Sequence, residues 1–439
     1  MAEAGSPTVA PTEPVIASPK GHPSEAKGGT ATTPYPPADH STGDDRRLAA
    51  ANTKLTLVIL LLSVALACSV AAIVALSISI AVDNKNEERQ ITTIVNRGRP
   101  AGFWYPIQPA GAQPGARLAH AATTAFDTTL FIHGGLFGFG NQSLNDLWEY
   151  HEPSDTWTEL NPTGDVPTAR LHHSMVTVND QTLLLFGGFN VFNLDPSHRS
   201  LDNLFEYNIV ARRWTRIQPI QGMPWPTPRG AHDAVVMNGY MWVFGGFPTI
   251  TATGHHEELW RYDPRTSSWQ NMTMTTPWPE GRIGFGFTNI GDTAFLLGGG
   301  CESTGQCGDT WRYHALTNRW EDHAPSGYLP TARRATHADV ALYNMIYMFG
   351  GVNISVVGGA PVVKMLDDLN AYDPVANKWY PVYADFNRGQ RPPATFGHSL
   401  NSLGSRLVLF GGRVGVPTSA GSNQLWEYDV VPPLGVSRR

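Results

Sequence analysis

One aromatic pair recurs along this 439-residue chain and limits the folds open to it. Five times a Tyr is followed seven residues later by a Trp, and each pair comes after a double glycine. The pairs are Tyr150/Trp157, Tyr207/Trp214, Tyr262/Trp269, Tyr313/Trp320 and Tyr372/Trp379. Six double glycines, from Gly134-Gly135 to Gly411-Gly412, are spaced 52 to 61 residues apart. Repeats of about this length are typical of propellers and solenoids.

The sixth repeat lacks its own Trp. Tyr428 is present, but Gly435 stands seven residues later. Trp104 lies 13 residues before Arg117, the same spacing as Trp157 to Arg170. This offset predicts that residues 103–108 form the outer strand of the last repeat and close a ring of six.

The residues around each double glycine have the pattern of strands. The run Leu183-Leu184-Leu185-Phe186 before Gly187-Gly188 is short and bounded by turn residues, which indicates a buried strand. The glycines allow the chain to leave that strand with a positive φ, or allow a neighbouring backbone to approach closely. We expect four strands per repeat, forming one blade whose faces are buried only when neighbouring blades stack.

These motifs resemble those of the kelch-repeat family of β-propellers over residues 101–431. An Arg-x-x-His element opens most repeats: Arg117/His120, Arg170/His173, Arg229/His232 and Arg334/His337. The resemblance implies an all-β, six-bladed kelch propeller, closed by the N-terminal strand. The structural repeat tryptophans are then Trp104, Trp157, Trp214, Trp269, Trp320 and Trp379. Phe285 in the fourth repeat and Thr395 in the sixth depart from the element, so we expect a central channel that differs between blades.

A second feature lies near the N-terminus. Residues Leu55 to Val82 contain no charged side chain. As a helix this run would reach about 42 Å, against a hydrocarbon core of about 30 Å. The sequence therefore predicts a transmembrane signal anchor at 54–82, since a cleaved signal peptide has a shorter apolar region nearer the start. A disordered tail (1–53) rich in Pro, Ser, Thr and Ala precedes it, a linker (83–100) follows it, and residues 432–439 form a C-terminal tail.

The orientation of the anchor rests on signals other than charge. Arg46, Arg47 and Lys54 on one side nearly balance Lys85, Arg89, Arg97 and Arg99 on the other. Three glycosylation sequons, at Asn141, Asn271 and Asn353, all fall in the propeller. Cys301 and Cys307 are six residues apart, a spacing that suits a local disulfide in an oxidising compartment. We therefore expect a single-pass protein of the plasma membrane or secretory pathway, with a cytosolic N-terminus and an extracellular or lumenal propeller.

Several functional classes are disfavoured by composition and motifs. The net charge is −6 and no basic run with interleaved aromatics occurs outside the membrane flanks, so no nucleic-acid partner is expected. No cofactor or metal is expected either, and the repeated histidines are interpreted as structural hydrogen-bonding groups. Copper-radical oxidases of this fold need a free Cys, and the propeller cysteines lie in one loop. A mutarotase-like, sugar-active enzyme using axial Arg and His side chains stays open as the alternative.

The favoured hypothesis is a non-catalytic interaction module that binds a protein or glycan partner through its long loops. These connections open on one side of the ring, and long loops on a rigid scaffold are where recognition usually occurs. The candidate partner-binding residues are Phe192, His198, Arg199 and Arg413, in loops without a sequon. Phe137, Phe139, Trp225 and Trp278 are further apolar anchors on this face, although about half of the loop aromatics are expected to cap the ends of the propeller instead. A homodimer is also possible through small residues at four-residue steps in the membrane segment: Ser63, Ala67, Ala71, Ala75 and Ser79.

Overall fold

The computed structural model describes residues 101–138, 142–190, 199–248, 254–274, 277–330, 334–357, 360–382, 390–415 and 421–431. All of them belong to one compact unit, Gly98–Arg439. Outside them lie the predicted tail, membrane helix with its small-residue ridge, linker and C-terminal tail, as well as Phe139, Asn141, Phe192 and His198. The described part contains one short 3-10 helix, η1 (Glu152–Ser154), and no helix there has the length and apolar character of a membrane span.

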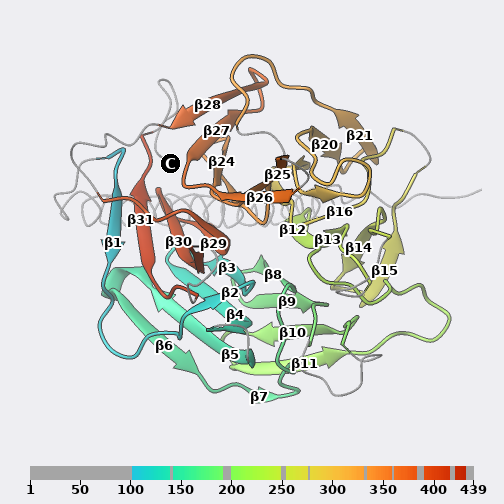
Figure 1. Cartoon of the computed structure of the whole chain (residues 1–439). Coiled ribbons are helices and arrows are strands. Elements are labelled where there is room, and N and C mark those ends of the chain that lie inside the picture. Colours follow the sequence, from blue (N-terminus) through green and yellow to red (C-terminus); the bar gives the residue numbers. More distant parts are fainter. Residues whose placement is uncertain are drawn as a thin grey trace, which may run out of the picture. The chain divides into compact units, whose positions relative to one another are not determined.

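The repeats form six blades around a common axis (Figure 1). From the axis outward, the first three blades are β3 (Ala121–Ala125), β4 (Thr129–Phe137), β5 (Gln142–His151) and β6 (Thr156–Leu160); β8 (Ser174–Asn179), β9 (Thr182–Phe186), β10 (Leu204–Asn208) and β11 (Arg213–Ile217); and β12 (Asp233–Met237), β13 (Tyr240–Phe244), β14 (Leu259–Asp263) and β15 (Ser268–Asn271). The strands of each blade pair antiparallel, so all-β architecture with four strands per repeat is confirmed.

The second half of the ring repeats this arrangement. Its blades are β17 (Gly286–Ile290), β18 (Thr293–Leu297), β20 (Thr310–His314) and β21 (Arg319–Asp322); β23 (Ala338–Leu342), β24 (Met345–Phe349), β27 (Leu369–Asp373) and β28 (Lys378–Val382); and β29 (Thr395–Leu403), β30 (Arg406–Val414), β31 (Leu425–Asp429) and β1 (Trp104–Ile107). Further strands lie in the connections between the blade strands: β2 (Arg117–Leu118), β7 (Thr163–Gly164), β16 (Arg282–Ile283), β19 (Gly300–Cys301), β22 (Arg334–Ala335), β25 (Val352–Val357) and β26 (Ala360–Met365).

Strand β1 closes the ring, as the Trp spacing predicts. It pairs antiparallel with β31, with Trp104 opposite Tyr428. In each of the other five blades the repeat Tyr and Trp also stand directly opposite each other, as in Tyr207↔Trp214. The first strand of the propeller therefore supplies the outer strand of the last blade, and no sheet edge is left open at the junction.

The repeat aromatics fill the seams between blades. Trp104 packs on Phe349 of the fifth blade at 5.4 Å between ring centroids, and Trp269 packs on Phe186 of the second blade at 5.1 Å. Both tryptophans are buried. Each blade thus buries its aromatic layer against its neighbour, which is why a single repeat could not fold alone.

The double glycines permit close contact between blades. Gly187 and Gly188 have φ values of 66° and 96°, and a Cβ on Gly187 would lie 2.7 Å from the carbonyl oxygen of Arg229. The amide of Gly188 donates to that same carbonyl at 2.8 Å. In the first and sixth blades the chain does not leave the strand here, and the glycines serve the close approach of a neighbouring backbone alone. There β4 and β30 continue past the glycines, because the bulge between His133 and Gly135 absorbs the positive φ of β4.

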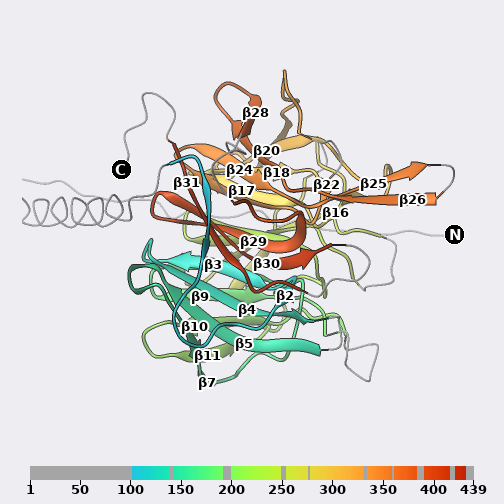
Figure 2. The same ribbon diagram turned by 60° about the vertical axis from the view of Figure 1, so that its left-hand side comes forward.

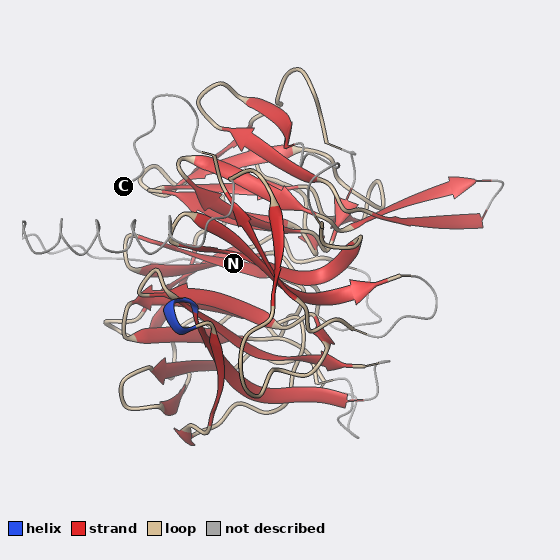
Figure 3. Ribbon diagram, turned by 90° about the vertical axis from the view of Figure 1, so that its left-hand side faces the viewer, coloured by secondary structure: helices blue, strands red, loops and turns tan. Residues whose placement is uncertain are grey.

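The ring has two unlike faces. One face carries tight turns between the two inner strands, such as Asn238-Gly239, and between the two outer strands; we call it the turn face. The other carries the long connections, and we call it the loop face. One of these connections, 352–365, forms the hairpin of β25 and β26, in keeping with its β-branched residues. Figures 2 and 3 show this hairpin projecting from the loop face.

Candidate functional site

Four of the repeat arginines, Arg117, Arg170, Arg229 and Arg282, are buried inside their blades. Arg117 makes two hydrogen bonds with the carboxylate of Asp146, at 2.8 and 2.7 Å, and a third with the carbonyl of Gly134 at 3.0 Å. Arg282 repeats this arrangement with Asp309 and the carbonyl of Gly298. These side chains therefore fix the double glycine of their own blade and do not reach toward a ligand at the axis.

The repeat histidines link neighbouring blades. His120 lies 3.0 Å from the hydroxyl of Ser399 in the sixth blade, and His232 lies 3.0 Å from the hydroxyl of Ser174 in the second. Burial lowers the pKa of His120 and of His232 to about 3, with Arg117 and Arg229 adding to the effect. Both rings are therefore neutral at physiological pH, which suits a structural hydrogen-bonding role.

The innermost strands of all six blades line an axial cavity of about 470 Å³. Its described lining contains five repeat histidines and two aspartates but no arginine. The acidic residues are Asp233 at the start of β12 and Asp339 in β23, two residues that our motif analysis missed. Their signal in the sequence is a broken repeat, since Phe285-Gly286 replaces the His and its neighbour in the blade between them.

Asp233 and Asp339 both lean on the fourth blade. Oδ1 of Asp233 accepts from the amide of its own neighbour Ala234 at 2.7 Å, and its carboxyl also bonds to the amide of Phe287 in the fourth blade. A Cβ on Gly286 of the same blade would clash with Oδ1 of Asp339. Burial raises the pKa of Asp233 to about 7. Burial, and then the charge of Asp233, raise the pKa of Asp339 well above its usual value. Near neutral pH this carboxyl pair retains a proton, so the axis is polar but weakly charged.

Two of the candidate partner-binding residues lie on described parts of the loop face. Arg199 ends the connection of the second blade, where its carbonyl accepts from the amide of Asn190 at 2.7 Å. Arg413 lies in β30 of the sixth blade, opposite Phe396. Both are half-buried. These two blades flank the first blade, so the residues come from both of its sides.

Trp225 and Trp278, two of the predicted apolar anchors of this face, pack against other side chains of the propeller. Trp225 packs on Trp269 at 6.1 Å and donates its indole hydrogen to the carbonyl of Asp202 at 2.9 Å. Trp278 packs on Trp320 at 6.0 Å and donates to the carbonyl of Glu257. They cap the seams between blades, so neither offers a free apolar anchor to a partner.

The hairpin of β25 and β26 gives the loop face an exposed apolar surface instead. Ile354 and Val363 stand opposite each other across the hairpin, and both are about half exposed. The sequon residue Asn353 is next in sequence to Ile354 and therefore points to the other side of the ribbon. A glycan there would leave the apolar side accessible. Asn271, a second sequon residue, is exposed at the end of β15.

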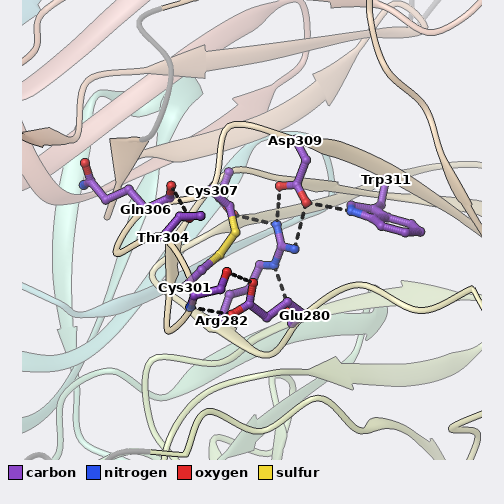
Figure 4. Close-up of a disulfide and its surroundings, with 10 residues drawn as sticks. Glu280, Arg282, Cys301, Thr304, Gln306, Cys307, Asp309 and Trp311 are labelled. Atoms are coloured by element: carbon purple, nitrogen blue, oxygen red, sulfur yellow. Dashed lines mark hydrogen bonds and ion pairs between the residues drawn. A yellow bond between two sulfur atoms is a disulfide. The ribbon is translucent and has the colours of Figure 1, made fainter.

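Cys301 and Cys307 form a disulfide in the structure, and the loop that it closes braces three blades (Figure 4). Within this loop Glu302 accepts from the amide of His255 in the third blade at 3.0 Å. The buried side chain of Gln306 donates to the carbonyl of Val352 at 3.1 Å and accepts from the amide of Ile354 at 2.8 Å. The base of the projecting hairpin is therefore held by the disulfide loop.

Comparison with known proteins agrees with this architecture, which defines a six-bladed propeller of kelch repeats. The model of the KLHDC2/KLHL20/DRC7 Kelch-repeats domain matches residues 100–299 and 195–412. The chain belongs to this kelch-repeat family. The solved structure of YjhT covers 71% of this chain and 95% of its own, with a TM-score of 0.55 and 16% identity, a similarity that shows the fold alone.

Relatives of known sequence share the propeller at low identity. Kelch domain-containing protein 3 of Homo sapiens is 24% identical over 67% of this chain and 77% of its own length. Kelch domain-containing protein 10 of Xenopus tropicalis is 27% identical over 56% of this chain. The leucine-zipper-like transcriptional regulator 1 homolog of Drosophila melanogaster is 23% identical over 72% of this chain. The chain spans 62% of the length of the frog protein and 32% of that of the fly protein.

Proposed function

We propose that this protein is a membrane-tethered, non-catalytic interaction module that binds a protein or glycan partner through its loop face. Kelch propellers are in general protein-interaction modules. The proposal rests on the difference in connection length between the two faces. Connections as long as 187–203 open on one of them, whereas two-residue turns such as Asn238-Gly239 make up the inner part of the other.

The point at which the chain enters the ring also favours binding through the loop face. The amide of Gly102 donates to the carbonyl of Asp429 at 2.8 Å, at the end of β31 that lies on the turn face. In this proposal the uncharged run Leu55–Val82 is the tether, and residues 83–100 connect it to this point of the chain. The loop face is the opposite face of the ring.

A sugar-active enzyme is the second candidate, favoured by the carboxyl pair in the axial cavity. Its proposed arginines, however, are buried in hydrogen bonds within the blades. The repeat histidines, in turn, hold neighbouring blades together. The interaction module therefore accounts for more of the described side chains than the enzyme does.

Partner capture from a membrane extract by the full chain tests the proposal. Replacing Phe192, Arg199 and Arg413 together by Ala should reduce capture of bound proteins or glycoproteins at least tenfold with an unchanged melting temperature. The matched control replaces Gln181 and Asp292, exposed residues of the turn face, by Ala. Loss of capture in the control with full capture by the triple variant would place recognition on the turn face.

A further inference from the structure

One position of the repeat is exposed and apolar in most blades. It is the third residue after the repeat Tyr, which in the first five blades lies in the turn that joins the two outer strands. Its occupants are Pro153, Val210, Arg265, Leu316, Val375 and Val431. The exposed fractions of Val210, Leu316, Val375 and Val431 are 75%, 79%, 94% and 60%. Among the described residues these are the four most exposed large hydrophobic side chains.

All six positions lie on the turn face. They recur at the same point of each blade, so the approximate sixfold symmetry of the ring places them around its circumference. We call the five apolar residues (Pro153, Val210, Leu316, Val375 and Val431) the apolar rim. The third blade breaks the series with Arg265, whose Nε lies 2.9 Å from a carboxylate oxygen of Asp263.

Folding does not require an apolar side chain at this position. The turn is held by the residue before it, since Oδ1 of Asp373 accepts from the amides of Val375 and Ala376 at 2.8 and 3.0 Å. The same contact exists in the third blade, where Oδ1 of Asp263 accepts from the amide of Arg265 at 2.9 Å. Because Arg fits this turn, the aliphatic side chains elsewhere are not explained by turn geometry or packing.

The chain enters the propeller beside this rim. A Cβ on Gly102 would lie 3.7 Å from a methyl group of Val431. Eighteen residues, 83–100, separate this point from the uncharged run Leu55–Val82. Extended, they reach at most about 60 Å, so a tether would hold the turn face close to the membrane at high effective concentration. Several aliphatic side chains that each partition weakly would then suffice for contact.

We propose that the apolar rim is where the propeller lies against a lipid bilayer surface. The inference rests on the membrane tether of the proposed function, and it directs the loop face away from the lipid. Charge favours a zwitterionic surface, because Asp127, Asp180 and Asp292 are exposed in the inner turns of the same face. Two basic residues of the outer turns, Arg212 and Arg265, pair with Glu149 and Asp263.

Depth-dependent fluorescence quenching tests the proposal on the full chain in phosphatidylcholine nanodiscs. Cys68→Ser removes the unpaired cysteine, and Val375→Cys carries a bimane label on the rim. Ile354→Cys, on the loop-face hairpin, carries the same label as the matched control. Lipids with a nitroxide on the acyl chain should quench the rim label at least threefold more than the control label. Adding Val210→Asp and Leu316→Asp should reduce that ratio toward one.

Equal quenching of the two labels would overturn the proposal. The rim label could instead be shielded from solvent only when a disc holds two or more chains, without being quenched by lipid. That result would overturn the proposal in favour of contact with a second copy. Alkaline carbonate extraction separates the two levels of the account. If the chain resists extraction but its rim label is not quenched, only the proposal about the apolar rim is contradicted. If the chain is extracted, the proposals of the membrane tether and of the rim are both contradicted.

Discussion

Trp104 shows at the scale of one residue how the ring is held closed. Its ring lies 5.2 Å from that of Tyr428 in the same blade and 5.4 Å from that of Phe349 in the blade before. It is buried, although it comes from a strand more than 300 residues away in the sequence from Tyr428. One side chain thus joins the first strand, the last blade and a seam.

Trp104→Ala should therefore destabilise the propeller by about 3–5 kcal/mol, the usual cost of removing a buried Trp side chain. The measurement is the shift in the unfolding midpoint in urea. Tyr380→Ala, at an exposed aromatic in the outer strand of the fifth blade, serves as control and should cost far less. If the two variants unfold alike, Trp104 does not close the ring.

Asp233 provides a prediction about pH at the same scale. Its pKa in the folded protein is about 7, against 3.8 for the ordinary group, because burial disfavours the charged form. Between these values the folded state binds more protons than the unfolded state, so this carboxyl lowers stability as pH rises from about 4 to about 7. Asp233→Asn keeps an acceptor for the amide of Ala234 but cannot ionise. The variant should gain stability relative to the parent between pH 5 and pH 8 in thermal unfolding scans, and a constant difference would contradict the assignment.

The disulfide loop and the β25–β26 hairpin show how elements of different blades depend on each other. Gln306 bonds to both backbone groups at the base of β25, much as a neighbouring strand would. A two-stranded hairpin is marginally stable by itself. The position of this projecting element on the loop face therefore depends on a side chain from the adjacent blade.

Gln306→Ala should loosen the hairpin while leaving the blades intact. Removing both hydrogen bonds leaves a buried carbonyl at Val352 without this donor, at a cost of about 1–3 kcal/mol. Hydrogen exchange should rise at the amide of Ile354 and stay unchanged in β24 and β27. Thr304→Ala is the control in the same loop; its hydroxyl donates to the backbone carbonyl of Gln306 at 2.9 Å, so this change leaves the amide side chain of Gln306 in place. Equal exchange at Ile354 in parent and variant would show that the hairpin is held by other contacts.

At the scale of the whole molecule, the sequence predicted the ring better than the site. The Tyr–Trp spacing and the offset of Trp104 predict blade number and closure, because the spacing is a local pattern that occurs five times and the offset supplies the Trp missing from the sixth repeat. The carboxyl groups of Asp233 and Asp339 escaped prediction, since they come from the third and fifth blades and are brought to one cavity only by the folded ring. The sequence also did not predict which side chains are exposed. Trp225 and Trp278 pack over the seams between blades, whereas Val375 is almost fully exposed.

The proposed function requires that the propeller and the N-terminal tail lie on opposite sides of a membrane. Expression of the full chain in a eukaryotic secretory host, followed by endoglycosidase treatment, measures this directly. We predict a mobility shift that shrinks stepwise with Asn271→Gln and Asn353→Gln, and a propeller that resists protease added to the cytosolic side of intact vesicles. A chain with no glycan shift, whose propeller is cleaved from the cytosolic side, would contradict the account and leave Cys301 and Cys307 in a reducing compartment.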